Sequence, residues 1–194
     1  MRQFTKPLLF NSVIGQRIRR LIPIMVLGLF LSFTVAVLAP IFMSARFAAR
    51  QTSNMRNLKS LADGCLQYST DFGDRLPRAD RWMDSIDRYL QKGELTYRNP
   101  YRDDGDYGYA MNADLSAVVY DSVPNPLGTI LVYESRGIGR NHSAPGAKIP
   151  EDAFIHADAT GSYVVFVDGT THFLDKKALC AAAVHPDELT QKTP

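Results

Sequence analysis

Acidic residues are missing from the first 59 positions of this 194-residue chain, which hold nine basic residues. Residues 60–194 hold the other thirteen basic residues and all 20 acidic ones, a net charge of −7. The overall charge of +2 therefore hides a basic N-terminal segment and an acidic remainder. Because phosphate binding needs clustered lysine and arginine, the acidic remainder argues against a nucleic-acid partner.

Charge of either sign is missing from the 25 residues Leu21–Ala45. At about 1.5 Å per helical residue, this run can cross the roughly 30 Å hydrocarbon core of a membrane. Arg17, Arg19 and Arg20 precede it, and the positive-inside rule then keeps residues 1–20 cytoplasmic and exports the remainder. A cleaved signal peptide is the competing interpretation, but the apolar core of signal peptides has only roughly 7–15 residues and is shorter than this run. We expect a single-pass protein of the cell (inner) membrane.

Cysteine is scarce, since only Cys65 and Cys180 are present. Two cysteines permit one disulfide bond and do not demand it. Both lie in apolar, helix-like segments, where a buried thiol behaves as a small hydrophobic side chain. Unpaired thiols are the favoured interpretation, and a Cys65–Cys180 bridge remains open.

Motifs of nucleophilic catalysis, phosphate binding and zinc binding are also missing. The chain has no G-x-S-x-G, no Gly-rich phosphate loop and no H-E-x-x-H. Four residues could be drawn as a metal or acid–base cluster around one predicted strand, namely His156, Asp158, Asp168 and His172. The strand between the two pairs separates them by about 15 Å at 3.3 Å per residue. We therefore interpret Asp168-Gly169 as a hairpin turn and predict a protein that is not an enzyme.

A long helix is predicted from Leu21 to about Phe72, with Pro40 deep enough inside it to cause a kink. Beyond Pro40, apolar or small side chains recur with the i, i+3, i+4, i+7 period of a helix with one buried stripe. They are Leu58, Leu61, Ala62, Cys65, Leu66, Ser69 and Phe72. Gly73 is predicted to end this helix. A short second helix is predicted after an N-cap at Asp80 and ends at Gly93.

Three strands are predicted from β-branched and aromatic runs, with a weaker fourth candidate. They are Thr129–Tyr133, Tyr163–Val167 and Thr171–Leu174, and the weaker candidate is Val118–Tyr120. A small sheet cannot leave both faces bare, so the stripe of the long helix must cover one of them. The predicted fold class is α+β, with a long N-terminal helix packed on a three- to four-stranded antiparallel sheet.

The predicted organisation has four parts. Residues 1–20 form the basic cytoplasmic N-terminus and residues 21–45 the transmembrane helix. Residues 46–184 form the extracytoplasmic head, which includes the helical stalk 46–72. Residues 185–194 form a polar tail that is predicted to be flexible.

The segment APIFMSARFAARQTSNMRNLKSLADGCLQYSTDFGDRLP resembles the first helix of bacterial type IV pilin-like and type II secretion pseudopilin-like proteins. The positions that carry the likeness are Asn57, Leu58, Lys59, Tyr68, Asp71, Leu76 and Pro77. The segments 106–112 (DYGYAMN) and 125–135 (NPLGTILVYES) resemble the same group, as does the pattern of His156, a strand, Asp168 and Gly169. Together the resemblance covers about residues 38–175.

The resemblance implies a pilin-like fold and a structural role in a type II secretion or type IV pilus-like envelope system. Its implied partners are membrane lipid and other pilin-fold subunits or secretion components. We expect no cofactor, with Ca²⁺ as the alternative, because proteins of the pseudopilin-like group sometimes bind this ion in their loops. The prepilin cleavage signature of the family is absent, because Ile18, Arg19 and Pro23 stand where Gly, an aromatic residue and Glu are usual. We therefore expect an uncleaved, permanently anchored relative.

An alternative function is an anchored binding module for Ca²⁺, a glycan or a peptide at the loop 97–109. Asp103, Asp104 and Asp106 are weak Ca²⁺ candidates, because this ion takes six to eight oxygen ligands and the spaced D-x-D-x-D-G pattern is absent. A solvated turn is favoured there. The loop also carries four tyrosines that could stack on a sugar, although packing onto the sheet is favoured. They are Tyr97, Tyr101, Tyr107 and Tyr109.

Overall fold

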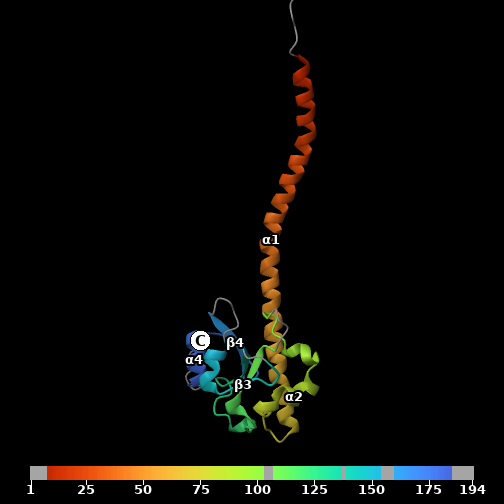
Figure 1. Ribbon diagram of the computed structural model, residues 1–194. Helices are drawn as coiled ribbons and strands as arrows, with labels where there is room; N and C mark the ends of the chain where they lie inside the picture. The colour runs from red at the N-terminus through yellow and green to blue at the C-terminus, as the bar shows by residue number, and fades with distance from the viewer. Residues whose placement is uncertain (1–7, 103–106, 137–138, 154–159, 185–194) are drawn as a thin grey trace, which may run out of the picture. The chain divides into compact units, whose positions relative to one another are not determined.

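The computed structural model describes residues 8–102, 107–136, 139–153 and 160–184 (Figure 1). The chain divides into two compact units, Met1–Ala48 and Ala49–Pro194, of which the second is the head. The described residues of the first unit form the N-terminal part of helix α1 (Leu8–Asp71), whose C-terminal part belongs to the head. The described chain is an α+β protein in which a long N-terminal helix packs on a sheet.

Helix α1 begins 13 residues before the predicted start at Leu21 and ends one residue before the predicted end at Phe72. Gly73 closes it with φ +68°, a left-handed conformation that glycine adopts without strain. The N–H of Asp74 donates to the carbonyl of Ser69 at 2.8 Å, which completes a Schellman-type end. The prediction that Gly73 ends the helix is confirmed.

The sheet of the head has five strands in the order β3-β1-β2-β4-β5. Their bounds are β1 (Tyr109–Asn112), β2 (Ile130–Glu134), β3 (Ser143–Ala144), β4 (Gly161–Phe166) and β5 (Thr171–Asp175). All neighbours are antiparallel except β1 and β3, which are parallel. The prediction of three to four antiparallel strands was therefore wrong in number and in the orientation of one pair.

The weak strand candidate Val118–Tyr120 was also wrong. A 3₁₀ turn occupies Tyr120–Ser122, and one isolated bridge joins Arg75 to Val119. The strands that were not predicted are β1, which lies in a segment rich in Gly, Asn and Asp (residues 97–116), and the two-residue β3. The three stronger candidates correspond to β2, β4 and β5.

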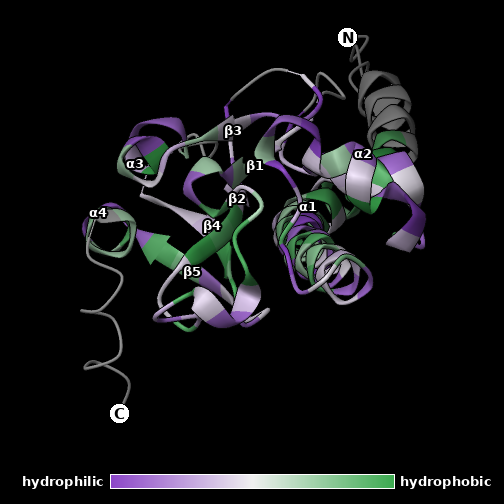
Figure 2. Cartoon of the chain, turned by 90° about the horizontal axis from the view of Figure 1, so that it is seen from below, coloured by the Kyte–Doolittle hydropathy of each residue, from purple (hydrophilic) through white to green (hydrophobic). Residues whose placement is uncertain are grey.

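Both faces of the sheet are covered by helices, as Figure 2 shows. On one face the strands pack with α1 and α2 (Trp82–Ile86) around a core that includes Leu58 and Trp82. On the other face they pack with α3 (Ile149–Asp152) and α4 (Lys176–Val184) around a second core. Side chains of β4 alternate between the two cores. This double burial explains why the strand reads as a continuous apolar run.

The predicted buried stripe of α1 is largely confirmed. Leu58, Leu61, Ala62 and Cys65 are fully buried in the first core and Ser69 is 5% exposed. Leu66 is half-buried, and Phe72 is 45% exposed because it lies beyond the end of the helix.

The start of α2 differs from the prediction. Asp80 lies in a preceding 3₁₀ turn and pairs with Arg78 at 3.0 Å, so it does not cap the helix. The cap comes from the distant Asn141, whose Oδ1 accepts hydrogen bonds from the N–H groups of Met83 (2.8 Å) and Asp84 (3.3 Å). After α2 the chain continues in 3₁₀ turns at Asp87–Tyr89 and Gly93–Tyr97.

The two cysteines lie on opposite faces of the sheet and are both unpaired. Cys65 is buried in the core beneath α1, where burial raises the pKa of its thiol far above the ordinary value. Cys180 is exposed on α4. The favoured interpretation of free thiols is confirmed.

Candidate functional site

The first unit presents an apolar helix surface to its surroundings. Every large apolar side chain from Leu21 to Met43 is 44–74% exposed. Among the described residues, α1 holds the one stretch that is long and apolar enough to span a membrane. A helix that is apolar all round is stable only when protein or lipid covers it. Pro40 lies inside this helix, and the kink predicted there stays a prediction.

In the head, a buried carboxylate joins α1 to the sheet. Glu134 is fully buried at the end of β2, and its Oε1 accepts hydrogen bonds from Nδ2 of Asn54 (2.8 Å) and Nδ2 of Asn99 (3.0 Å). Its Oε2 accepts from the N–H of Tyr163 at 2.7 Å and from the hydroxyl of Ser162 at 3.3 Å. We call these five residues the Glu134 cluster. Buried charges persist in proteins when such hydrogen bonds replace water.

A second layer of hydrogen bonds surrounds the Glu134 cluster. The hydroxyl of Tyr109 donates to Oδ1 of Asn54 at 2.7 Å, and Nδ2 of Asn57 donates to the carbonyl of Arg98 at 3.2 Å. Burial is the main cause that raises the pKa of Tyr109 well above its usual range, so this phenol stays a donor. The arrangement fixes α1 to β1, β2, β4 and the segment around Asn99.

A third group of polar side chains holds the connection between β2 and α3. Oδ2 of Asp152 lies 2.6 Å from the hydroxyl of Ser135, 3.0 Å from that of Tyr133 and 2.9 Å from Nε2 of His142. Serine, histidine and aspartate therefore meet here, but both the serine and the histidine contact the carboxylate. A serine nucleophile needs a general base that accepts its proton, and here the hydroxyl of Ser135 donates to the carboxylate of Asp152. We call these residues the Asp152 cluster and interpret its role as structural, because it holds the connection between β2 and α3 in place.

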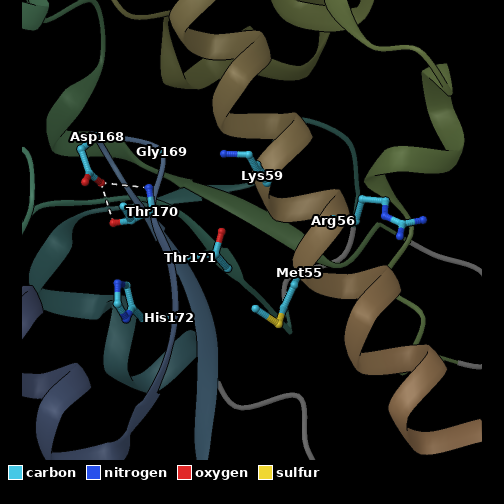
Figure 3. A pocket seen from close by; sticks show the side chains of 8 residues that line it. All are labelled: Met55, Arg56, Lys59, Asp168, Gly169, Thr170, Thr171 and His172. Atoms are coloured by element: carbon cyan, nitrogen blue, oxygen red, sulfur yellow. Dashed lines mark hydrogen bonds between the residues drawn. The ribbon is translucent and has the colours of Figure 1, made fainter. Parts of the chain in front are cut away.

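An open groove runs along α1 beside the β4–β5 hairpin, with a volume of about 630 Å³ (Figure 3). Met55, Arg56 and Lys59 of α1 form one wall, and the hairpin residues 168–172 form the other. Figure 3 shows Met55 and Lys59 pointing toward the hairpin and Arg56 pointing away from it. We call this feature the hairpin groove.

The predicted site residues are only partly within the described chain. Asp103, Asp104, Asp106, His156 and Asp158 lie outside the described residues. The Ca²⁺ candidates and the binding-module alternative therefore stay predictions. The described residues contain no group of three or more His, Cys, Asp or Glu side chains able to hold a metal ion.

Asp168 and Gly169 form the turn of the β4–β5 hairpin. Oδ1 of Asp168 accepts hydrogen bonds from the N–H (2.9 Å) and the hydroxyl (2.7 Å) of Thr170, and Gly169 has φ +83°. These are the contacts of a turn, as predicted. His172 is exposed on β5, with its ring centroid 5.5 Å from that of Phe166.

The four loop tyrosines divide into two pairs. Tyr97 and Tyr109 are buried in the core, where a sugar cannot stack on them. Tyr101 and Tyr107 are half-buried, and the hydroxyl of Tyr107 donates to Glu94 at 2.9 Å. Burial is the largest cause that raises the pKa of Tyr101 to about 12. The favoured packing interpretation is confirmed for Tyr97 and Tyr109.

The Glu134 and Asp152 clusters were missed at the level of sequence. A signal for the first was available, because Asn54 and Asn57 precede Leu58 and Leu61 at helical spacing and so fall on the buried stripe. No such signal marks Glu134 or Asp152, which receive their donors from segments distant in sequence. No family model, curated protein or solved structure matches this chain.

Proposed function

We propose that this chain is a membrane-anchored, pseudopilin-like structural component of a type II secretion or type IV pilus-like envelope system, without enzymatic activity. It acts by lateral packing of its apolar helix and by association of its head with like subunits. Residues 1–20 face the cytoplasm, and the head faces the outside of the inner membrane.

The observation that carries the proposal is the uninterrupted exposure of apolar side chains from Leu21 to Met43. Exposing this surface to water is unfavourable by about 25 cal/mol for each Å² of apolar area, so lipid or other helices must cover it. The same helix α1 supplies the buried stripe of the head and two asparagines of its polar interior. Because α1 contributes side chains to the core of the head, it suits a permanent anchor that is not cleaved from the head.

Two further features support the pseudopilin-like assignment. The resemblance in residues 38–175 follows the order of the elements, from the long helix to the Asp168-Gly169 turn. The described architecture supports the proposal at the coarse level, because it is an α+β fold with a long N-terminal helix packed on a sheet.

Membrane anchoring is tested by alkaline carbonate extraction of cell membranes. The chain is expected in the membrane pellet. Phe33→Arg places a charge near the middle of the apolar run at a cost of about 3 kcal/mol and should move a large part of the protein to the soluble fraction. Phe33→Leu is the matched control and should leave the protein in the pellet. A wild-type chain that carbonate extracts would overturn the proposal.

The structural role is tested by cross-linking the wild-type chain in its native membranes. We expect adducts with copies of itself or with pilin-fold and secretion components, identified by mass spectrometry of the cross-linked bands. Recovery of the monomer alone, at cross-linker levels that capture a known membrane oligomer, would contradict the proposed role. The intact mass of the purified protein adds a second test, because cleavage near Arg19 would indicate a processed pilus subunit.

A further inference from the structure

We draw no further inference here: the strongest candidate, the hairpin groove between α1 and the β4–β5 hairpin, is an open surface lined by Met55 and Lys59, and nothing in the structure shows what covers it.

Discussion

Asn54 of α1 and Glu134 of β2 are both fully buried and lie 80 positions apart in sequence, joined by a hydrogen bond of 2.8 Å from Nδ2 to Oε1. This bond ties helix α1 to the central strand of the head's sheet. Oδ1 of Asn54 also accepts a hydrogen bond of 2.7 Å from the hydroxyl of Tyr109. One side chain therefore satisfies both a carboxylate and a phenol in the interior.

Asn54→Ala should destabilise the head. The substitution leaves a buried carboxylate with one donor fewer and a buried phenol without its acceptor, and each such loss costs about 1–3 kcal/mol. Urea unfolding of the detergent-solubilised chain, followed by near-ultraviolet circular dichroism, measures the change. Gln67→Ala is the control, because Gln67 is exposed on the same helix and its loss should change stability by less than about 0.5 kcal/mol. Equal midpoints for the two variants would contradict a stabilising role for this bond.

Gly108→Ala should weaken the same cluster from its other side. A Cβ at position 108 would lie 2.3 Å from Cβ of Asn99, whose Nδ2 donates to Glu134. Relief of the clash must move Asn99 away from the carboxylate, and overpacking of this kind typically costs about 1–3 kcal/mol. The measurement is again the unfolding midpoint.

A double-mutant cycle separates the clash from other effects of Gly108→Ala. In an Asn99→Gly background the opposing Cβ is gone, so the second substitution should cost much less than in the wild type. If its cost is the same in both backgrounds, the contact between positions 99 and 108 is not the cause.

Sequence patterns were sufficient to predict the buried residues where burial follows from local periodicity. Leu58, Leu61, Ala62 and Cys65 recur at helical spacing, and burial of one stripe is the only stable solution for such a helix. The sequence of β4 predicted a strand equally well, because a continuous run of β-branched and aromatic residues favours a strand.

The features that the sequence did not predict depend on contacts between residues that are distant in sequence. Strand β1 has four residues in a segment rich in Gly, Asn and Asp, and its pairing with β2 and β3 makes it a strand. Glu134 ends an apolar strand, where a charged residue is usually exposed. Its burial depends on donors contributed by three other parts of the chain. Sequence spacing does not reveal these donors.

Asn141→Ala should destabilise the packing of α2. Oδ1 of Asn141 accepts from two N–H groups at the start of this helix, and loss of such a cap costs about 0.5–2 kcal/mol. Asn141 also has φ +62°, where alanine is strained by about 1–2 kcal/mol. Asn141→Gly also removes the cap, but glycine adopts a positive φ without strain. Thermal stability should therefore decrease in the order wild type, Asn141→Gly, Asn141→Ala. A glycine variant as unstable as the alanine variant would show that strain contributes nothing.

Alkaline pH should unfold the head as its buried tyrosines ionise. Burial is the main cause that raises the pKa of Tyr97, Tyr109 and Tyr133 above the usual value, and it raises that of Tyr101 to about 12. The folded chain then holds protons that the unfolded chain releases near pH 10. Stability should therefore be constant below about pH 9 and fall as pH rises from about 10 toward 12. Absorbance at 295 nm should show these tyrosines ionising together with unfolding, and their smooth titration near pH 10 in the folded chain would contradict this.

Thiol labelling should distinguish the two cysteines. A maleimide is expected to modify the exposed Cys180 alone in the folded chain, because burial both covers Cys65 and raises the pKa of its thiol, and only the thiolate reacts quickly. In denaturant both should react. Cys180→Ser should remove the native labelling and keep one reactive thiol after denaturation. In intact cells with a permeabilised outer layer, a membrane-impermeant maleimide should also label Cys180, since the proposed topology exports the head. Labelling of Cys180 only after the inner membrane is opened would place the head in the cytoplasm and reverse the proposed orientation.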